Sequence, residues 1–131
     1  MHLMDLFIPI EPVPWQRVFP FQGRLVTPKE TRAFQRTVGR LAKYAMGNRA
    51  AFKTPLAVRV LFKLQQPDKF RKRPFPDVKM DIDNLTKNLF DGLNGIIWDD
   101  DGRIVEIRIE KIWSTFGAGS ISLRVFEAEV K

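Results

Sequence analysis

The chain has 131 residues with 22 Lys and Arg against 15 Asp and Glu, which gives a net charge of +7. This length and a hydrophobic content of 44% predict a single globular domain over residues 1–131, and no apolar run approaches the length of a membrane span. The absence of cysteine excludes disulfides, thiolate metal sites and a cysteine nucleophile, and the single histidine, His2, lies at the chain end, so carboxylates and lysine remain as catalytic candidates.

The N-terminal region combines a predicted strand with a proline-rich segment. Residues 3–10 are mostly apolar and are followed by prolines, which predicts a strand, and no basic region precedes them as in a leader peptide, which indicates a cytosolic protein. Residues 11–28 contain four prolines, and Gln22-Gly23 predicts a small hairpin or an irregular loop. Three aromatic side chains here could stack on nucleic-acid bases or pack in a core or dimer contact: Trp15, Phe19 and Phe21.

A helix is predicted from the capping box of residues 27–30, with Pro28 at its first position, to about Met46, where Gly47 would end it. Its buried stripe would consist of Phe34, Val38, Leu41 and Ala45. The opposite side carries a basic ridge formed by Arg32, Arg36, Arg40 and Lys43. Such a ridge is either a solvated face or a contact for DNA backbone.

Positive charge is concentrated in the first half of the chain. Residues 17–79 hold sixteen of the 22 Lys and Arg against three acidic residues. They include a predicted strand at 56–64 and then a basic, proline-bearing loop at 67–79, which we expect to be mobile when free and to order on phosphates. The charge asymmetry favours DNA contact for this loop and for the basic ridge. The loop's candidate DNA-binding residues are Lys69, Arg71, Lys72, Arg73 and Lys79.

Negative charge is concentrated in residues 81–101, which contain six of the nine aspartates. So many carboxylates repel one another unless they share a cation. Asp81 and Asp83 are two residues apart, so an extended segment would point both to one side, roughly 6 to 7 Å apart, where they can share a divalent cation.

The residues after Asp83 have the apolar spacing of an amphipathic helix, with Asp81 or Asp83 as its cap and Gly95 just past its end. Lys87, one turn after Asp83, would lie on the same face as the carboxylates. Each feature alone is explained by an ordinary ion pair or by a turn at 99–102, whereas together they favour a functional site. Asp91, one turn after Lys87, is interpreted as its surface partner.

Alternating apolar residues predict two further strands, at 105–109 and 121–125, which run antiparallel and are joined across residues 114–119. The predicted order is β, hairpin or loop, α, β, α, β, β. This order indicates an α+β domain with two main helices packed on a mixed sheet.

The acidic stretch also carries a family resemblance. The pattern D-x-D-N-x-x-K, an aspartate four residues on and W-x-D-D after an apolar run occurs as Asp81, Asp83, Asn84, Lys87, Asp91, Trp98, Asp100 and Asp101. This pattern resembles the RusA family of Holliday-junction resolvases. The similarity extends over most of the chain in order and size, while its specific motifs lie within residues 81–105.

The resemblance implies a Mg²⁺-dependent endonuclease, with Mn²⁺ as a possible substitute and no organic cofactor. Carried over from the family, the metal ligands are Asp81, Asp83 and Asp101, and Lys87 assists catalysis. A one-residue slip in the triple aspartate would make Asp100 the third ligand. The implied partners are four-way junction DNA and a second copy in a homodimer, with no membrane, in a bacterial or prophage-encoded protein.

Two other classes of function fit the same residues. A non-catalytic binder of branched or single-stranded DNA would use the same basic surface. A purely structural role would use the aspartates only to cap a helix and form turns.

Overall fold

The computed structural model describes residues 1–115 and 117–131, with the side chains of Phe19, Phe21 and Val26 left out of the description. Its main sheet has four strands in the order β1-β6-β4-β5. They are β1 (His2–Ile8), β6 (Ser120–Glu127), β4 (Leu56–Leu64) and β5 (Ile104–Trp113). The pair β4–β5 is parallel and the other two pairs are antiparallel, which confirms the predicted mixed sheet.

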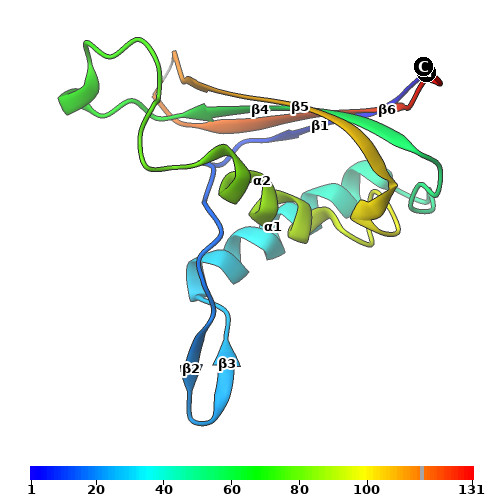
Figure 1. Ribbon diagram of the computed structural model, residues 1–131, viewed down its shortest axis with the longest axis horizontal. Helices are drawn as coiled ribbons and strands as arrows, with labels where there is room; N and C mark the ends of the chain where they lie inside the picture. The colour runs from blue at the N-terminus through cyan, green and yellow to red at the C-terminus, as the bar shows by residue number, and fades with distance from the viewer. Residues whose placement is uncertain (116) are drawn as a thin grey trace.

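Two helices, α1 (Lys29–Met46) and α2 (Ile82–Leu93), cover one face of this sheet (Figure 1). Strand side chains alternate between faces, and every second residue of β4, from Leu56 to Leu64, is buried beneath the helices. Leu85, Leu89 and Leu93 of α2 are also fully buried, as the helical spacing predicts. The α+β class and the order of the elements are therefore as expected.

The strands β5 and β6 run in opposite directions, as predicted, but they are not neighbours. The strand β4 lies between them and pairs with both. The predicted hairpin is therefore not formed, and Ser114 N, just after β5, donates to the carbonyl of Leu64 at the end of β4 at 2.7 Å. Alternation within a strand reports which face is buried but carries no information on which strand lies alongside.

The proline-rich segment forms the hairpin that was one of the two predicted alternatives. Its strands β2 (Phe19–Phe21) and β3 (Arg24–Val26) pair antiparallel and project away from the sheet and helices (Figure 1). Gln22 and Gly23 both have positive φ, 51° and 76°, as a two-residue hairpin turn requires. The base-stacking prediction for Phe19 and Phe21 concerns side chains that lie outside the described part.

The capping box predicted for α1 is wrong. The N-cap is Pro28, and it makes no side-chain capping hydrogen bond. The buried stripe includes Thr31, Ala42 and Met46 as well as the predicted Phe34 and Val38. Two predicted members of the stripe are only half-buried, Leu41 and Ala45. The predicted C-terminal cap, Gly47, is confirmed with φ of 59°.

The two helices approach closely through glycines. A Cβ on Gly92 of α2 would lie 3.2 Å from the backbone of Gln35 in α1, and a Cβ on Gly39 would lie 3.3 Å from the Gly92 carbonyl oxygen. The same interface contains a buried amide, because Gln35 donates to Asn88 Oδ1 at 2.9 Å and Asn88 donates to the Val13 carbonyl at 2.8 Å. This packing fixes α2, which carries the predicted site residues, on α1 and the sheet.

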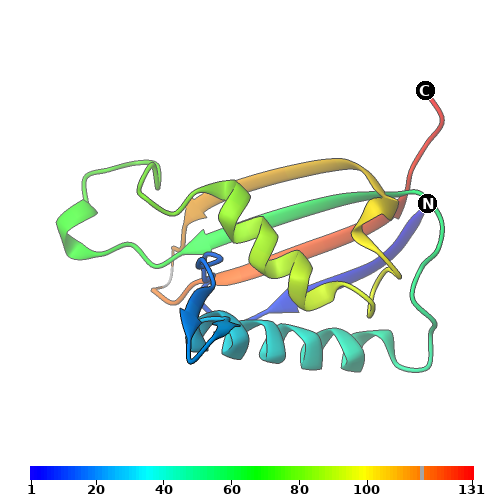
Figure 2. The same ribbon diagram turned by 60° about the horizontal axis from the view of Figure 1, so that its bottom comes forward.

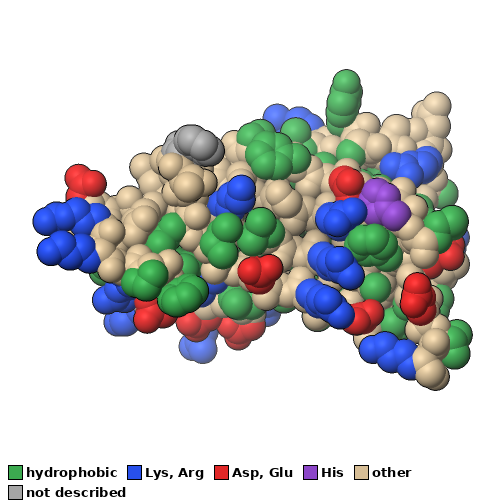
Figure 3. Space-filling model, turned by 90° about the horizontal axis from the view of Figure 1, so that it is seen from above, with side chains coloured by type: hydrophobic (Ala, Val, Ile, Leu, Met, Phe, Trp, Pro, Cys, Tyr) green, Lys and Arg blue, Asp and Glu red, His purple; other side chains and the backbone are tan. Residues whose placement is uncertain are grey.

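The other face of the sheet is open and carries basic, acidic and apolar side chains together (Figure 3). Arg108, Arg59 and Arg124 lie side by side across β5, β4 and β6, and Arg124 Nε contacts Asp5 Oδ1 at 3.3 Å. Among the described residues, no helix is long and apolar enough to cross a membrane.

Candidate active site

The first acidic group lies where α2 begins. Asp81 has the extended backbone of an N-cap residue, with φ of −66° and ψ of 140°, but its carboxylate makes no capping hydrogen bond. Asp83 follows in the first turn, and both side chains are exposed. The helix therefore starts without using either carboxylate, and the partial positive charge of its N-terminus favours anionic groups at this position.

The ammonium of Lys87 lies over an aromatic ring. Its Nζ is 3.7 Å from the centroid of the Trp15 ring, a cation–π contact, and Trp15 N donates to the Asn84 carbonyl at 3.0 Å. Among the described residues, neither Asp83 nor Asp91 forms an ion pair with Lys87. The predicted ion pair between Lys87 and Asp91 is therefore wrong, because the lysine instead contacts the ring of Trp15 in the proline-rich segment.

The second acidic group lies in the turn before β5, and two of its three aspartates have local partners. Asp99 accepts from Arg103 Nε at 2.8 Å and Nη2 at 2.9 Å, and this hydrogen-bonded pair lowers the pKa of Asp99. Asp100 Oδ2 accepts from the backbone nitrogen of Gly102 at 3.0 Å. Asp101 opens a short helical turn (Asp101–Arg103) and has no side-chain hydrogen bond within the described chain. Of the two candidates for third ligand, Asp101 therefore has the less engaged carboxylate.

Asp91 joins the second acidic group from α2. Partial burial raises its pKa, the nearby Lys87 acts in the opposite direction, and the charge of Asp101 adds to the increase. The two carboxylates of Asp91 and Asp101 are thus close enough to interact. The sequence had suggested only a surface ion pair for Asp91.

The two acidic groups lie at opposite ends of β5 (Figure 2). Lys111 Nζ, near the end of β5, donates to the Met80 carbonyl at 2.7 Å, so the neighbouring Asp81 lies there, whereas Asp101 precedes the start of the strand. Seven residues of extended chain, from 104 to 111, correspond to about 20 Å. Within the described part of one chain, no three acidic or histidine side chains converge as a metal would require.

The basic loop before α2 is folded on itself. Gln66 Nε2 donates to the carbonyls of Phe70 and Arg73 at 2.8 and 3.0 Å, and Trp113 Nε1 donates to the same Arg73 carbonyl at 2.8 Å. The Phe70 ring stacks on Trp113 with centroids 6.2 Å apart. These contacts hold the predicted DNA-binding residues of the loop on a fixed base, where the sequence had led us to expect a mobile segment.

The loop's cations differ in how far they are engaged. Lys69 and Arg73 lie over the Phe70 ring, and Arg73 also contacts Asp77 Oδ1 at 3.6 Å. Arg71 and Lys72 are exposed, and neither forms an ion pair within the described chain. Lys79 lies beside Asp81 in the same hollow of the surface. The loop thus brings positive charge next to the first acidic group.

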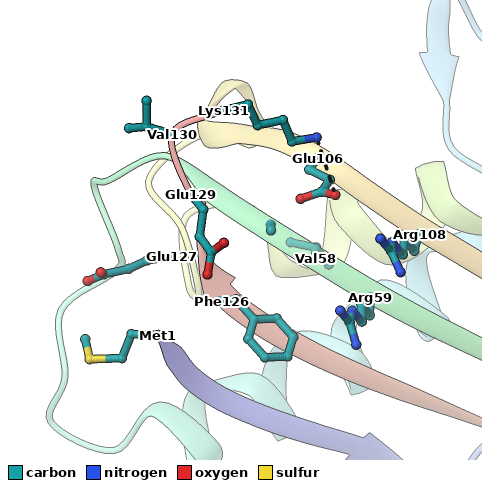
Figure 4. Close-up of a pocket in the computed structure, with 11 residues that line it drawn as sticks. Met1, Val58, Arg59, Glu106, Arg108, Phe126, Glu127, Glu129, Val130 and Lys131 are labelled. Atoms are coloured by element: carbon teal, nitrogen blue, oxygen red, sulfur yellow. Dashed lines mark ion pairs between the residues drawn. The ribbon is translucent and has the colours of Figure 1, made fainter.

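The basic ridge of α1 also lies next to the acidic residues. Its four cations, Arg32, Arg36, Arg40 and Lys43, are exposed and line a groove between α1 and α2, together with Asp91. A different hollow on the open face of the sheet, shown in Figure 4, is lined by Arg59, Arg108 and Phe126, and Lys131 pairs there with Glu106. None of the predicted site residues lines that hollow.

Exposed carboxylates on an α+β scaffold, framed by a cationic ridge and a cationic loop, are what a DNA-acting nuclease needs, because cations can hold phosphates and carboxylates can supply polar catalytic groups. A sequence model of the family described as endodeoxyribonuclease RusA matches residues 9–124. The chain belongs to the RusA family, endodeoxyribonucleases that resolve Holliday junctions by hydrolysis. A search of the curated proteins gives no match.

Sequence reasoning missed three features of this region. The contact of Trp15 with Lys87 spans 72 positions of the chain, and no local pattern predicts it. Lys111, just beyond the strand predicted at 105–109, bonds to the backbone immediately before Asp81. Trp113 stacks on the basic loop and bonds to it.

Proposed function

We propose that this RusA-family protein cuts four-way DNA junctions by paired, symmetric, Mg²⁺-dependent phosphodiester cleavage, with Mn²⁺ as a possible substitute. The match over residues 9–124 carries the proposal, because it includes both acidic groups, Lys87 and the whole basic loop. Resolving nucleases generally use a divalent metal, and carboxylate oxygens are the ligands that Mg²⁺ accepts. On this proposal the whole chain acts as one endonuclease domain.

The proposed ligands are Asp81, Asp83 and Asp101, with Asp100 as the alternative to Asp101. Asp81, Asp83 and Asp101 are exposed and are not used in capping, which supports a ligand role. A bound Mg²⁺ would lower the pKa of a coordinated water and balance charge on the phosphate. Lys87, held by Trp15, would stabilise negative charge on the same phosphate.

The separation of the acidic groups supports a homodimer in which each site takes residues from both chains. Asp81 and Asp101 are about 20 Å apart along β5, too far to share one ion. The strand β5 lies at the edge of the sheet, and its Val105 and Ile107 are 65% and 40% exposed. An unpaired strand edge with exposed apolar side chains is a ready surface for pairing with a second copy.

Symmetry relates this edge to the site. If two β5 strands pair antiparallel about a two-fold axis near Ile107, position 101 of one chain lies opposite position 113 of the other. Asp81 lies at that end of the strand, because Lys111 bonds to the adjacent Met80 carbonyl. Such a dimer would contain two equivalent sites, as two symmetric cuts require.

The basic ridge of α1 and the basic loop are the proposed DNA contacts. Their proposed DNA-binding residues are Arg32, Arg36, Arg40, Lys69, Arg71, Lys72, Arg73 and Lys79. The exposed position of the ridge beside Asp91, and of the loop beside Asp81, supports backbone contact on both sides of the carboxylates.

The direct test is cleavage of a synthetic four-way junction beside a linear duplex with the same arms, in Mg²⁺ or EDTA. We expect paired nicks in the junction alone, dependent on both metal and Asp81, and lost in Asp81→Asn. Tight binding of the junction in EDTA without any cleavage in Mg²⁺ or Mn²⁺ would instead identify a non-catalytic junction-binding protein.

A further inference from the structure

A hollow of about 720 Å³ lies directly beside Asp81, between the basic loop and the start of α2. Apolar side chains line part of it, from Phe70, Val78 and Met80. Three cationic side chains, of Lys69, Arg73 and Lys79, also line it. Pockets that hold small organic groups typically have volumes of about 300–1,000 Å³, mostly apolar walls and a few charged groups.

Contacts within the chain hold the backbone on two sides of this hollow. On one side, Phe70 is held by its stack on Trp113 and by the bond from Gln66 to its carbonyl. On the other side, Lys111 Nζ donates to the carbonyls of Met80, at 2.7 Å, and Val78, at 3.4 Å. A preformed site loses little entropy when it binds, so its shape can discriminate between ligands.

The side chains that line the hollow suit the two parts of a nucleotide, its base and its phosphates. Val78 and Met80 offer apolar surface to the flat face of a base, and the lysine and arginine side chains can hold the phosphates on either side of it. A free metal ion would make no contact with the apolar wall. The carboxylate of Asp81 lies among the lining residues, so a base bound here is adjacent to the phosphate at the proposed site.

We propose that this hollow receives the base of the nucleotide next to the scissile phosphate, unstacked at the crossover of the junction, and that Val78 and Met80 determine which base is accepted. The inference rests on the proposed function. An unpaired or strained base at a crossover costs less to unstack than one within a duplex, which limits binding in this hollow to branched substrates.

The test uses a panel of four-way junctions that differ only in the base pairs at the crossover, cut by wild type, Met80→Leu and Val78→Thr. The first substitution changes shape at nearly constant volume, and the second changes polarity at constant shape. We expect each to alter the relative cleavage rates among the junctions by about tenfold, the size of one altered contact in a specificity pocket. Tyr44→Ala is the control, because this exposed side chain of α1 lies far from the hollow and should leave the ranking unchanged.

A second readout does not depend on cleavage. In EDTA, 2-aminopurine placed at the nucleotide beside the scissile position should change in fluorescence when the wild-type protein binds, and the change should differ in Met80→Leu. Identical rankings for wild type and both variants, or equal cleavage of every junction by the wild type, would overturn the inference. A protein that cuts no junction but still gives the fluorescence change would refute the proposed function and leave the base-binding hollow in place.

Discussion

A site shared between two subunits predicts a particular pattern of complementation between inactive variants. Asp81→Asn and Asp101→Asn should each abolish junction cleavage, because every site of either homodimer lacks one ligand. In a mixed dimer, one site lacks both ligands and the other has both. Random exchange of subunits makes about half of the dimers mixed, each with one intact site of two, so about a quarter of the wild-type sites return.

The geometry behind this prediction is the separation of the two acidic groups in one chain. Asp81 lies beside Lys111 and Asp101 precedes the start of β5, about 20 Å away. A Mg²⁺ ion binds oxygens at about 2.1 Å, so no side-chain rotation within one chain closes this gap.

The assay mixes the two purified variants, allows subunit exchange through mild denaturation and refolding, and measures nicking of a four-way junction in Mg²⁺. Nicks should return at about a quarter of the wild-type rate and should be unpaired, since each mixed dimer cuts one strand. The matched control mixes Asp81→Asn with Asp83→Asn, whose mixed dimers have no intact site. Activity that stays at zero in the first mixture, with exchange verified by mass, would refute a shared site.

Three other perturbations have defined outcomes. Asp91→Asn should raise the melting temperature at pH 7, because partial burial raises the pKa of this carboxyl and its ionised form therefore destabilises the native state. The gain in melting temperature should fade as the pH falls through the native pKa of Asp91. An equal gain at pH 4 would contradict burial of the charge as its cause. Gly119→Ala should cost about 1–3 kcal/mol in urea unfolding, since its Cβ would overlap Glu11 Oε1 and lie 2.5 Å from a backbone carbonyl, whereas Glu11→Gln should cost less. Trp15→Ala should slow junction cleavage several-fold at unchanged affinity, as expected for a cation–π contact of about 0.5–1 kcal/mol with the exposed Lys87. Trp15→Phe should restore part of the rate. Equal rates for all three proteins would rule out a positioning role for Trp15.

Much of the fold follows from local patterns. Apolar alternation located β4, β5 and β6, and three-and-four spacing located both helices to within a few residues, because each element buries one face or stripe. The predicted α1 capping box does not form, because the chain enters the helix through Pro28, whose side chain has no hydrogen-bonding atom. A short motif indicates which local structure a segment can form, whereas its connections to the rest of the fold decide whether that structure forms.

For the site, the sequence by itself predicted which residues carry the chemistry, and it indicated the family, which the match over residues 9–124 confirms. The six clustered aspartates, Lys87 and the basic loop are all local patterns, and the family match contains them. Their arrangement in space was decided only by the tertiary structure. Residues 81 and 101 are close in sequence, but the helix α2 runs back along β5 and separates them by its whole length, about 18 Å for 12 residues.

The strand order is the second feature that only the tertiary structure decided. Placing β4 between β5 and β6 leaves β5 at the edge of the sheet, with Val105 and Ile107 exposed. Pairing between strands depends on contacts between distant segments, and a period of two in the sequence is the same for a central strand and an edge strand. The carboxylates were therefore identifiable from the sequence, whereas their separation, and the free edge through which a second copy can bring them together, follow from long-range packing.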